Sequence, residues 1–175
     1  MKTVAIVQAR MGSTRLPDKV MKPIGGVPMI EVLLTRLARA RELDQIVVAT
    51  SVDARNEPLA DCVRQLGFAC VQGDEQDVMA RQADVIVRIT GDCPLVDPEL
   101  VDHMIRGYRA AGVDYYSNVA PPSYPDGLDI EVFSLRALEQ ASEQTDAAFD
   151  HEHVTPYLRE SEHFRVGAEQ NEQDL

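Results

Sequence analysis

The chain has 175 residues, of which 45% are hydrophobic and 26% are charged, and a formal net charge of −12 at pH 7. This length and composition are typical of one soluble domain with a single sizeable core. The acidic balance argues against nucleic-acid binding, and no apolar run is long enough to cross a bilayer. The apolar run after Lys2 is too short for a signal-peptide core, so we expect a cytoplasmic protein. Its three cysteines have no CxxC spacing, which indicates neither a disulfide framework nor a zinc site.

The basic residues are concentrated at one end of the chain. The first 30 residues contain five basic residues and one acidic residue, Asp18, a net charge of +4, so the remainder carries −16. All three lysines, Lys2, Lys19 and Lys22, belong to this segment. An acidic protein that gathers its cations in one segment is expected to bind a small anion there.

Predicted strands alternate with predicted helices through the first half of the chain. Residues 2–8 form an apolar, β-branched run without alternation, which predicts a buried strand. A loop rich in glycine, proline and charge follows, and Pro28 then begins a helix with its apolar residues on one face. Residues 45–50 predict a second buried strand, and residues 56–67 predict a helix that ends with Gly67 at its C-terminal cap.

The second half continues this alternation before it becomes less regular. Further strands are predicted at 68–71, 84–90, 114–118 and 128–133, and further helices after Asp97, after Ser134 and over 151–160. This order predicts an α/β domain with a mostly parallel sheet covered on both faces. Ligands bind such sheets beyond the carboxyl ends of the strands, where the polar loops after the first and fourth strands would meet.

Two features suggest that segments of a full domain are missing. A parallel crossover needs about a dozen residues or more, usually with a proper helix, but between the strands that end near Val71 and begin near Val85 only residues 77–83 could be helical, which is under two turns. The sequence also stops in the polar stretch 169–175 without a closing element. We expect one domain over 1–175 that lacks a helical segment after Arg81 and a C-terminal segment after Leu175.

The strongest chemical signal directly follows the first strand. Residues 8–19 read QARMGSTRLPDK, and backbone amides around Gly12 and Ser13, with two guanidinium groups and one ammonium group, suit a polyanion. The loop has no GxGxxG pattern, and it is not a Walker A loop because Lys19 is followed by Val20. The alternative is a solvated basic loop without a ligand.

The chain resembles the cytidylyltransferases that make CMP-activated sugar acids, most closely the branch called spore coat polysaccharide biosynthesis protein F. The resemblance rests on "IVQARMGSTRLPDKVMKPIGGVPMIE", followed in order by "ADVIVRITGDCPLVDPEL", "DYYSN", "YPDGLDIEVF" and "HEHVTPYLRE". It covers nearly the whole chain. It implies a three-layer, Rossmann-like nucleotide-diphospho-sugar transferase fold with a mixed, mostly parallel sheet.

The resemblance also implies roles for individual residues on the nucleotide side. Arg10, Ser13, Arg15 and Lys19 would hold the triphosphate of CTP, and Gln8, Ala9 and neighbouring backbone groups, with Gly12 in the loop, would complete the nucleotide site. Asp77 and Arg81 would lie near the nucleotide. Asp92 would bind Mg²⁺, which agrees with a carboxylate at the carboxyl end of a strand. The alternative for Asp92 is a turn-forming residue before Pro94.

The acceptor side is less well determined. The resemblance places Asp126, Asp129, Glu131 and His153 near a sugar or sugar-acid acceptor. On a strand, residues 129 and 131 would face the same way and form an acidic patch, but a turn with edge charges explains them equally well. A hydrogen bond from His153 to the acceptor and a helix cap are equally open. Arg88, within a buried strand, is expected in an internal ion pair.

We therefore expect a CTP-dependent nucleotidyltransferase with Arg10, Arg15, Lys19 and Asp92 as its catalytic residues and Mg²⁺ as its cofactor. Its partners would be CTP and a small acceptor, with no nucleic acid and no membrane. Proteins of the family that it resembles commonly form homodimers, so the resemblance implies that this chain could form one too. Two alternatives stay open: a nucleotide-sugar-dependent glycosyltransferase, disfavoured because Asp92 lacks the Asp-x-Asp pattern, and a catalytically inactive nucleotide-binding homologue.

Overall fold

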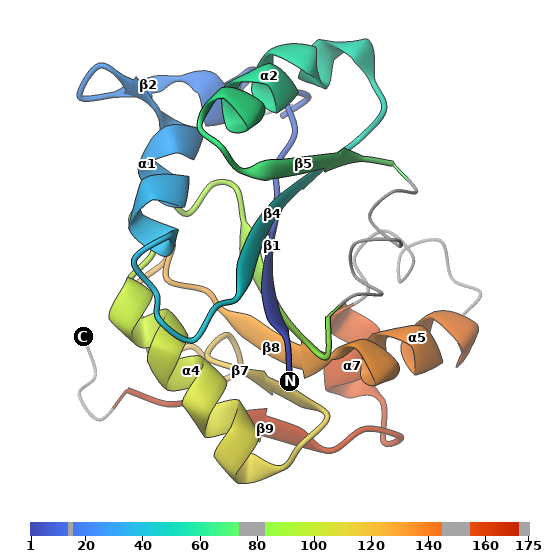
Figure 1. Cartoon of the computed structure of the whole chain (residues 1–175). Helices are drawn as coiled ribbons and strands as arrows, with labels where there is room; N and C mark the ends of the chain where they lie inside the picture. Colours follow the sequence, from blue (N-terminus) through green and yellow to red (C-terminus); the bar gives the residue numbers. More distant parts are fainter. Residues whose placement is uncertain (14–15, 74–82, 145–154, 172–175) are drawn as a thin grey trace.

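One mixed sheet organises the molecule. The computed structural model describes residues 1–13, 16–73, 83–144 and 155–171. In this part of the chain the main sheet has seven strands in the order β5-β4-β1-β6-β8-β7-β9 (Figure 1). The strands are β1 (Thr3–Gln8), β4 (Gln45–Thr50), β5 (Ala69–Gln72), β6 (Val85–Thr90), β7 (Tyr115–Ser117), β8 (Glu131–Ser134) and β9 (Val166–Ala168). Only β8 runs against its neighbours among these strands, so the expected mostly parallel sheet is confirmed.

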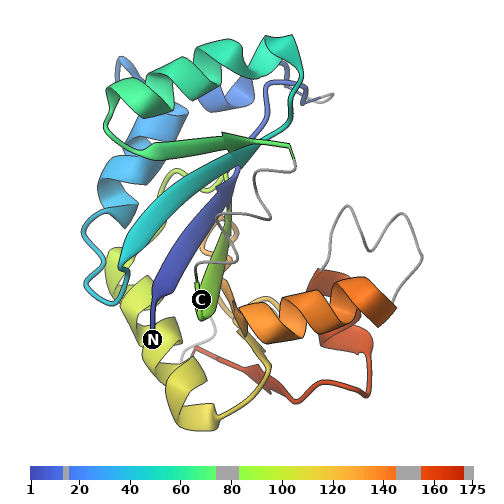
Figure 2. The same ribbon diagram turned by 45° about the vertical axis from the view of Figure 1, so that its right-hand side comes forward.

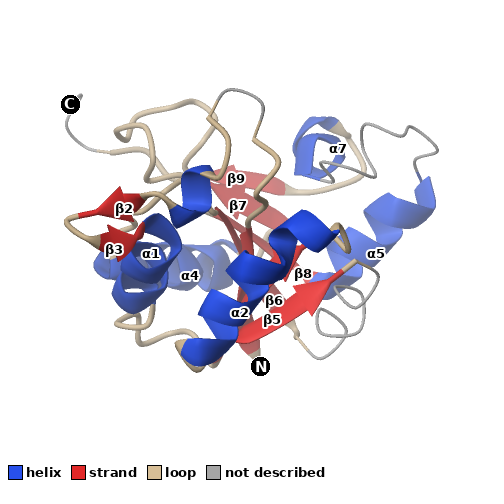
Figure 3. Ribbon diagram, turned by 90° about the horizontal axis from the view of Figure 1, so that it is seen from above, coloured by secondary structure: helices blue, strands red, loops and turns tan. Residues whose placement is uncertain are grey.

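Helices cover both faces of the sheet and give three layers (Figure 2, Figure 3). The described helices are α1 (Met29–Leu37), α2 (Glu57–Gln65), α4 (Pro98–Ala111), α5 (Leu135–Gln144) and α7 (Thr155–Glu160). α1, α2 and α4 pack on one face with one buried cluster, while α5 and α7 pack on the other face with a second cluster. Among the described helices, none combines the length and apolar character needed to span a bilayer.

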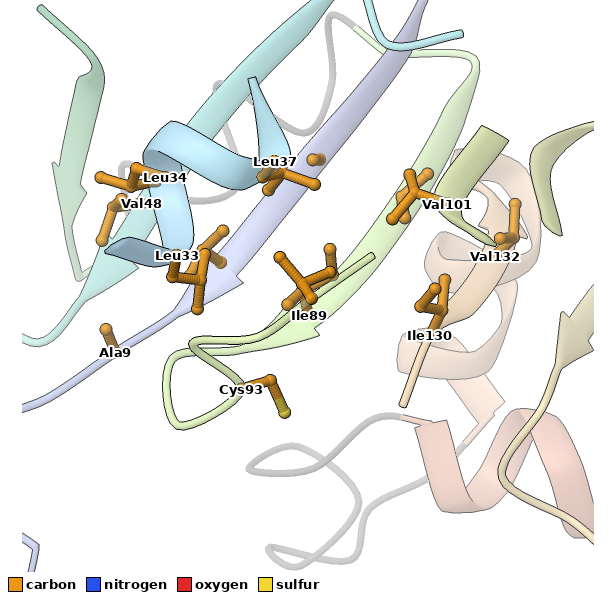
Figure 4. Packing of buried hydrophobic residues seen from close by; sticks show 14 of the residues in the cluster. Ala9, Leu33, Leu34, Leu37, Val48, Ile89, Cys93, Val101, Ile130 and Val132 are labelled. Carbon is orange, nitrogen blue, oxygen red and sulfur yellow. The ribbon is translucent and has the colours of Figure 1, made fainter. Parts of the chain in front are cut away.

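The core forms because the sequence places large apolar residues on matching faces. Leu33, Leu34 and Leu37 of α1 are fully buried and point toward Val48 of β4 and Ile89 of β6 (Figure 4). Burying each leucine side chain contributes about 1.5–3 kcal/mol. This packing fixes α1 against the central strands, and therefore fixes the point where the loop after β1 enters α1.

The helix boundaries follow the predicted caps. Asp97 accepts a hydrogen bond from the backbone N–H of Glu99 at the start of α4 (2.9 Å). Ser134 accepts one from the backbone N–H of Ala137 at the start of α5 (3.0 Å). Gly67 follows α2 with a φ of 84°, the left-handed conformation that glycine adopts readily at helix C-termini.

Two features of the main sheet and one of the loop after β1 differ from the prediction. β8 begins at Glu131 rather than at residue 128, because the Asn118 side chain forms the hydrogen bonds of this segment. Its Nδ2 donates to the Leu128 carbonyl (2.8 Å), and its Oδ1 accepts from the Ile130 N–H (2.8 Å). β9 was not predicted; it pairs parallel with β7 although its three residues carry no strand pattern. The predicted loop also contains the 3₁₀ helix η1 (Lys19–Met21) and a small hairpin of β2 (Pro23–Ile24) and β3 (Val27–Pro28).

Candidate active site

The loops after β1 and β6 meet at the carboxyl edge of the sheet. The backbone N–H of Gly91 donates to the carbonyl of Gln8 (2.7 Å), and the N–H of Ala9 donates to the carbonyl of Ala49 in β4 (3.0 Å). A Cβ at position 91 would lie 2.7 Å from the Ala9 Cβ and 2.9 Å from the Gln8 oxygen. Glycine is therefore needed at position 91 for the two loops to approach this closely.

This approach brings together two residues that the sequence predicted for the same site. Lys19 Nζ lies 3.1 Å from Asp92 Oδ2, across 73 residues of sequence. Both side chains remain partly exposed, at 32% and 47%. Burial raises the pKa of Asp92, but hydrogen bonds from Thr90 and Lys19 outweigh it, so the pKa of Asp92 lies below its ordinary value. Asp92 is therefore an ionised carboxylate beside the basic loop.

The basic loop is anchored by a buried asparagine that the sequence analysis did not identify. Asn56 is 2% exposed and its Oδ1 accepts from the backbone N–H of Met11 (2.8 Å). Its Nδ2 donates to the hydroxyl (2.7 Å) and the carbonyl (3.1 Å) of Ser51. The loop then closes on itself, since the N–H groups of Ser13 and Asp18 both donate to the Met11 carbonyl. No sequence motif indicates this role, apart from the position of Asn56 directly before α2.

The residues predicted to bind the nucleotide differ in their exposure and in their contacts. Arg10 and Gly12 are exposed, and Ser13 is half-buried on the same loop. Ala9 is 7% exposed. The Gln8 side chain accepts a hydrogen bond from Arg88 Nε (2.7 Å), so it is engaged within the sheet. Four predicted residues, Arg15, Asp77, Arg81 and His153, lie outside the described residues.

Glu131 has a structural environment that corrects the expectation of an open acidic patch. It is 5% exposed, forms an ion pair with Arg88 and accepts a hydrogen bond from the Tyr115 hydroxyl (2.6 Å). The register explains this pairing, because Arg88 and Glu131 are direct partners on β6 and β8. The internal ion pair expected for Arg88 is confirmed, and Glu131 is its partner.

Asp129 stays exposed, in contrast to Glu131, and lies among other acidic groups. Partial removal of water from its carboxyl raises the pKa of Asp129, and the negative charges of Asp126, Glu131 and Asp92 raise it further. The pKa of Asp129 therefore depends in part on the charge of Asp92, the residue that contacts Lys19. Asp126 lies on the same loop, and it is exposed like Asp129.

The donor set fits a divalent cation that is shared with a ligand. In the described ranges, no three His, Cys, Asp or Glu side chains gather to hold a metal by themselves. Asp92 offers one ionised carboxylate next to the Lys19 ammonium. Magnesium is commonly bound by one or two carboxylates together with substrate phosphates and water, so Asp92 suits such a cation only with a phosphate-bearing ligand.

Comparison with known proteins identifies the family. The family model described as cytidylyltransferase matches residues 4–172. The chain belongs to the cytidylyltransferase family. The spore coat polysaccharide biosynthesis protein SpsF of Bacillus subtilis is 36% identical over 173 residues, covering 88% of this chain and 68% of SpsF. An uncharacterised protein of Methanocaldococcus jannaschii is 38% identical over 169 residues, covering 92% of this chain and 68% of that protein.

Solved structures agree with this membership in the cytidylyltransferase family. A cytidylyltransferase from Leptospira borgpetersenii superposes with a TM-score of 0.92 at 30% identity, covering 99% of this chain and 78% of that one. A CMP:2-keto-3-deoxy-manno-octonic acid synthetase in complex with CTP has the same fold, with a TM-score of 0.72 at 17% identity, covering 98% and 90%. This chain is therefore a nucleotidyltransferase with the expected fold.

Proposed function

We propose that this cytidylyltransferase moves the cytidylyl group of CTP to a small sugar or sugar-acid acceptor, for the synthesis of a surface polysaccharide. The observation that carries the proposal is the contact between Lys19 and Asp92 at the carboxyl edge of the sheet. It combines a cation for phosphate oxygens with an ionised carboxylate for a divalent cation. The acceptor class is supported by the similarity to SpsF and to 3-deoxy-manno-octulosonate cytidylyltransferases, such as that of Zea mays at 32% identity.

The proposed reaction is an in-line displacement at the α-phosphorus of CTP. The oxygen of an acceptor hydroxyl forms the new P–O bond and its proton passes to solvent, while the bond from the α-phosphorus to the bridging oxygen breaks and pyrophosphate leaves with that electron pair. Arg10, Arg15 and Lys19 would neutralise the negative charge that develops on pyrophosphate. Asp92 would hold Mg²⁺, which when bound supplies further charge neutralisation at the phosphates. Asp126 and Asp129 would face the acceptor.

Residues behind the site would hold the two loops in the orientation that this reaction needs. Asn56 holds the backbone of the phosphate loop, and Gly91 lets the Asp92 loop approach it. The base would be read by backbone groups near Ala9, because the Gln8 side chain is engaged with Arg88. Fixed positions of this kind supply a large part of the rate enhancement in phosphoryl-group transfer.

The proposal is tested by pyrophosphate release from CTP and Mg²⁺ in the presence of a panel of sugar acids. We expect release with one acceptor class, and a loss of at least about a hundredfold in kcat/KM for Lys19→Met and Asp92→Asn. Lys22→Met is the matched control, since Lys22 is an exposed lysine in the same segment. CTP binding without release for any acceptor would favour the inactive homologue, and consumption of a nucleotide sugar would favour the glycosyltransferase.

A further inference from the structure

The turn after β4 forms a second wall of the basic loop. This turn, η2 (Ala54–Asn56), is preceded by Asp53, whose carboxylate caps it by accepting from the backbone N–H of Arg55 (2.9 Å). Its last residue, Asn56, anchors Met11 of the basic loop. The residue before it, Arg55, therefore projects from a segment that is fixed against the same loop.

The Arg55 guanidinium lies beside Gly12. A Cβ built on Gly12 would lie 3.9 Å from Arg55 Nη2, and among the described residues this is the nearest atom to it. Glycine therefore leaves open the space between the loop backbone and the guanidinium. Any larger side chain at position 12 would extend into that space, between Arg55 and a ligand bound against the Gly12 backbone.

An ion pair holds the guanidinium in this place. Arg55 Nε lies 3.0 Å and Nη2 lies 2.6 Å from Asp53 Oδ2. Hydrogen bonds from Arg55 lower the pKa of Asp53 to about 2. Because the Arg55 side chain is 74% exposed, the pair contributes little to the free energy of unfolding. Its main effect is to restrict the orientation of a guanidinium that otherwise projects into solvent.

We propose that Arg55 is an additional binding residue for the triphosphate of CTP, acting on the terminal phosphates alongside Arg10 and Lys19. The inference rests on the proposed function and extends it to a residue that the family resemblance did not assign. A guanidinium binds phosphate oxygens through paired N–H donors, and Asp53 leaves other donors of Arg55 available for this. Arg55 thus favours the triphosphate over a monophosphate of the same nucleoside.

Calorimetric titration of CTP, CMP and cytidine with Mg²⁺ tests this selectivity. We expect Arg55→Ala to weaken CTP about tenfold, a typical effect of one charge-assisted contact, and to change CMP less than twofold. Arg55→Lys should be intermediate, since it retains the charge without the paired donors. Arg64→Ala is the matched control, because Arg64 forms a similar exposed pair with Asp61 (3.3 Å) near the C-terminal end of α2.

The outcomes separate this inference from the proposed function. If the wild type binds CTP selectively and Arg55→Ala weakens CTP and CMP equally or not at all, Arg55 does not bind the terminal phosphates and only the inference fails. If the wild type binds no CTP, the proposed function fails. Titration with inorganic tripolyphosphate then tests Arg55 by itself, with a tenfold loss in Arg55→Ala supporting the inference and no loss overturning it.

Discussion

Replacing Asn56 with alanine should destabilise the protein and loosen the phosphate loop together. The Asn56 side chain is buried and makes hydrogen bonds of 2.8, 2.7 and 3.1 Å, to Met11 and twice to Ser51. Each such bond contributes about 1 kcal/mol, and a buried N–H left without its partner costs about 1–3 kcal/mol. Because the Ser51 groups can turn to water, we expect a loss of about 2–4 kcal/mol in the free energy of unfolding.

Urea unfolding at 25 °C measures this loss, and CTP titration measures its effect on the site. The Met11 amide would no longer be held, so part of the binding energy would be spent on ordering the loop, and we expect CTP affinity to fall about tenfold. Ser51→Ala is the control: it removes only the hydroxyl that accepts from Asn56 Nδ2 (2.7 Å) and leaves the bond from Met11 to Asn56, so CTP affinity should stay near the wild-type value. An Asn56→Ala protein as stable as the wild type to within about 0.5 kcal/mol would refute this account of the loop.

Three other variants test separate parts of the structure. Gly91→Ala should lose about 1–3 kcal/mol of stability in urea unfolding, because its Cβ would meet Gln8 and Ala9; unchanged stability would contradict the close approach of the loops. Glu131→Leu should cost about 3–5 kcal/mol by leaving Arg88 buried without its partner, and the double variant with Arg88→Met should recover most of this loss. The pKa of Asp129 is raised in the folded state, so its ionised carboxylate destabilises the fold. This destabilisation is present at pH 8, and it disappears as the pH falls through the folded-state pKa and reaches the ordinary pKa of an aspartate. Asp129→Asn should therefore melt above the wild type at pH 8 and together with it below about pH 4, whereas a lower melting temperature at pH 8 would contradict that sign.

Much of the fold could be predicted because its strands and helices carry strong periodic signals. β4 has the predicted bounds, β1 and β6 begin one residue later than predicted, and the helix that contains Leu33 and Leu37 buries the predicted face. β9 could not be predicted, because Gly167 and its neighbours form a strand only by pairing with β7. A Cβ on Gly167 would lie 2.6 Å from the ring of Tyr116, so this strand depends on tertiary packing rather than on local preference.

The candidate site could be predicted where residue type and strand position coincide. Lys19 and Asp92 both follow predicted parallel strands, and their contact follows from the topology. Glu131 carried the same kind of signal, but its environment depends on its register opposite Arg88, which a single sequence does not reveal. Asn56 and Arg55 were missed because the turn that contains them is far from the basic loop in sequence and carries no recognisable motif.

The central claim, that the basic loop binds CTP, is tested most directly by thermal stabilisation with CTP, UTP, ATP or GTP in the presence of Mg²⁺. A ligand that binds only the native state, and is present at a hundred times its Kd, stabilises that state by about 2.7 kcal/mol. This stabilisation raises the melting temperature. We predict a rise that is selective for CTP in the wild type and absent in Arg15→Ala. An equal rise with all four nucleotides, or none with any of them, would contradict the claim.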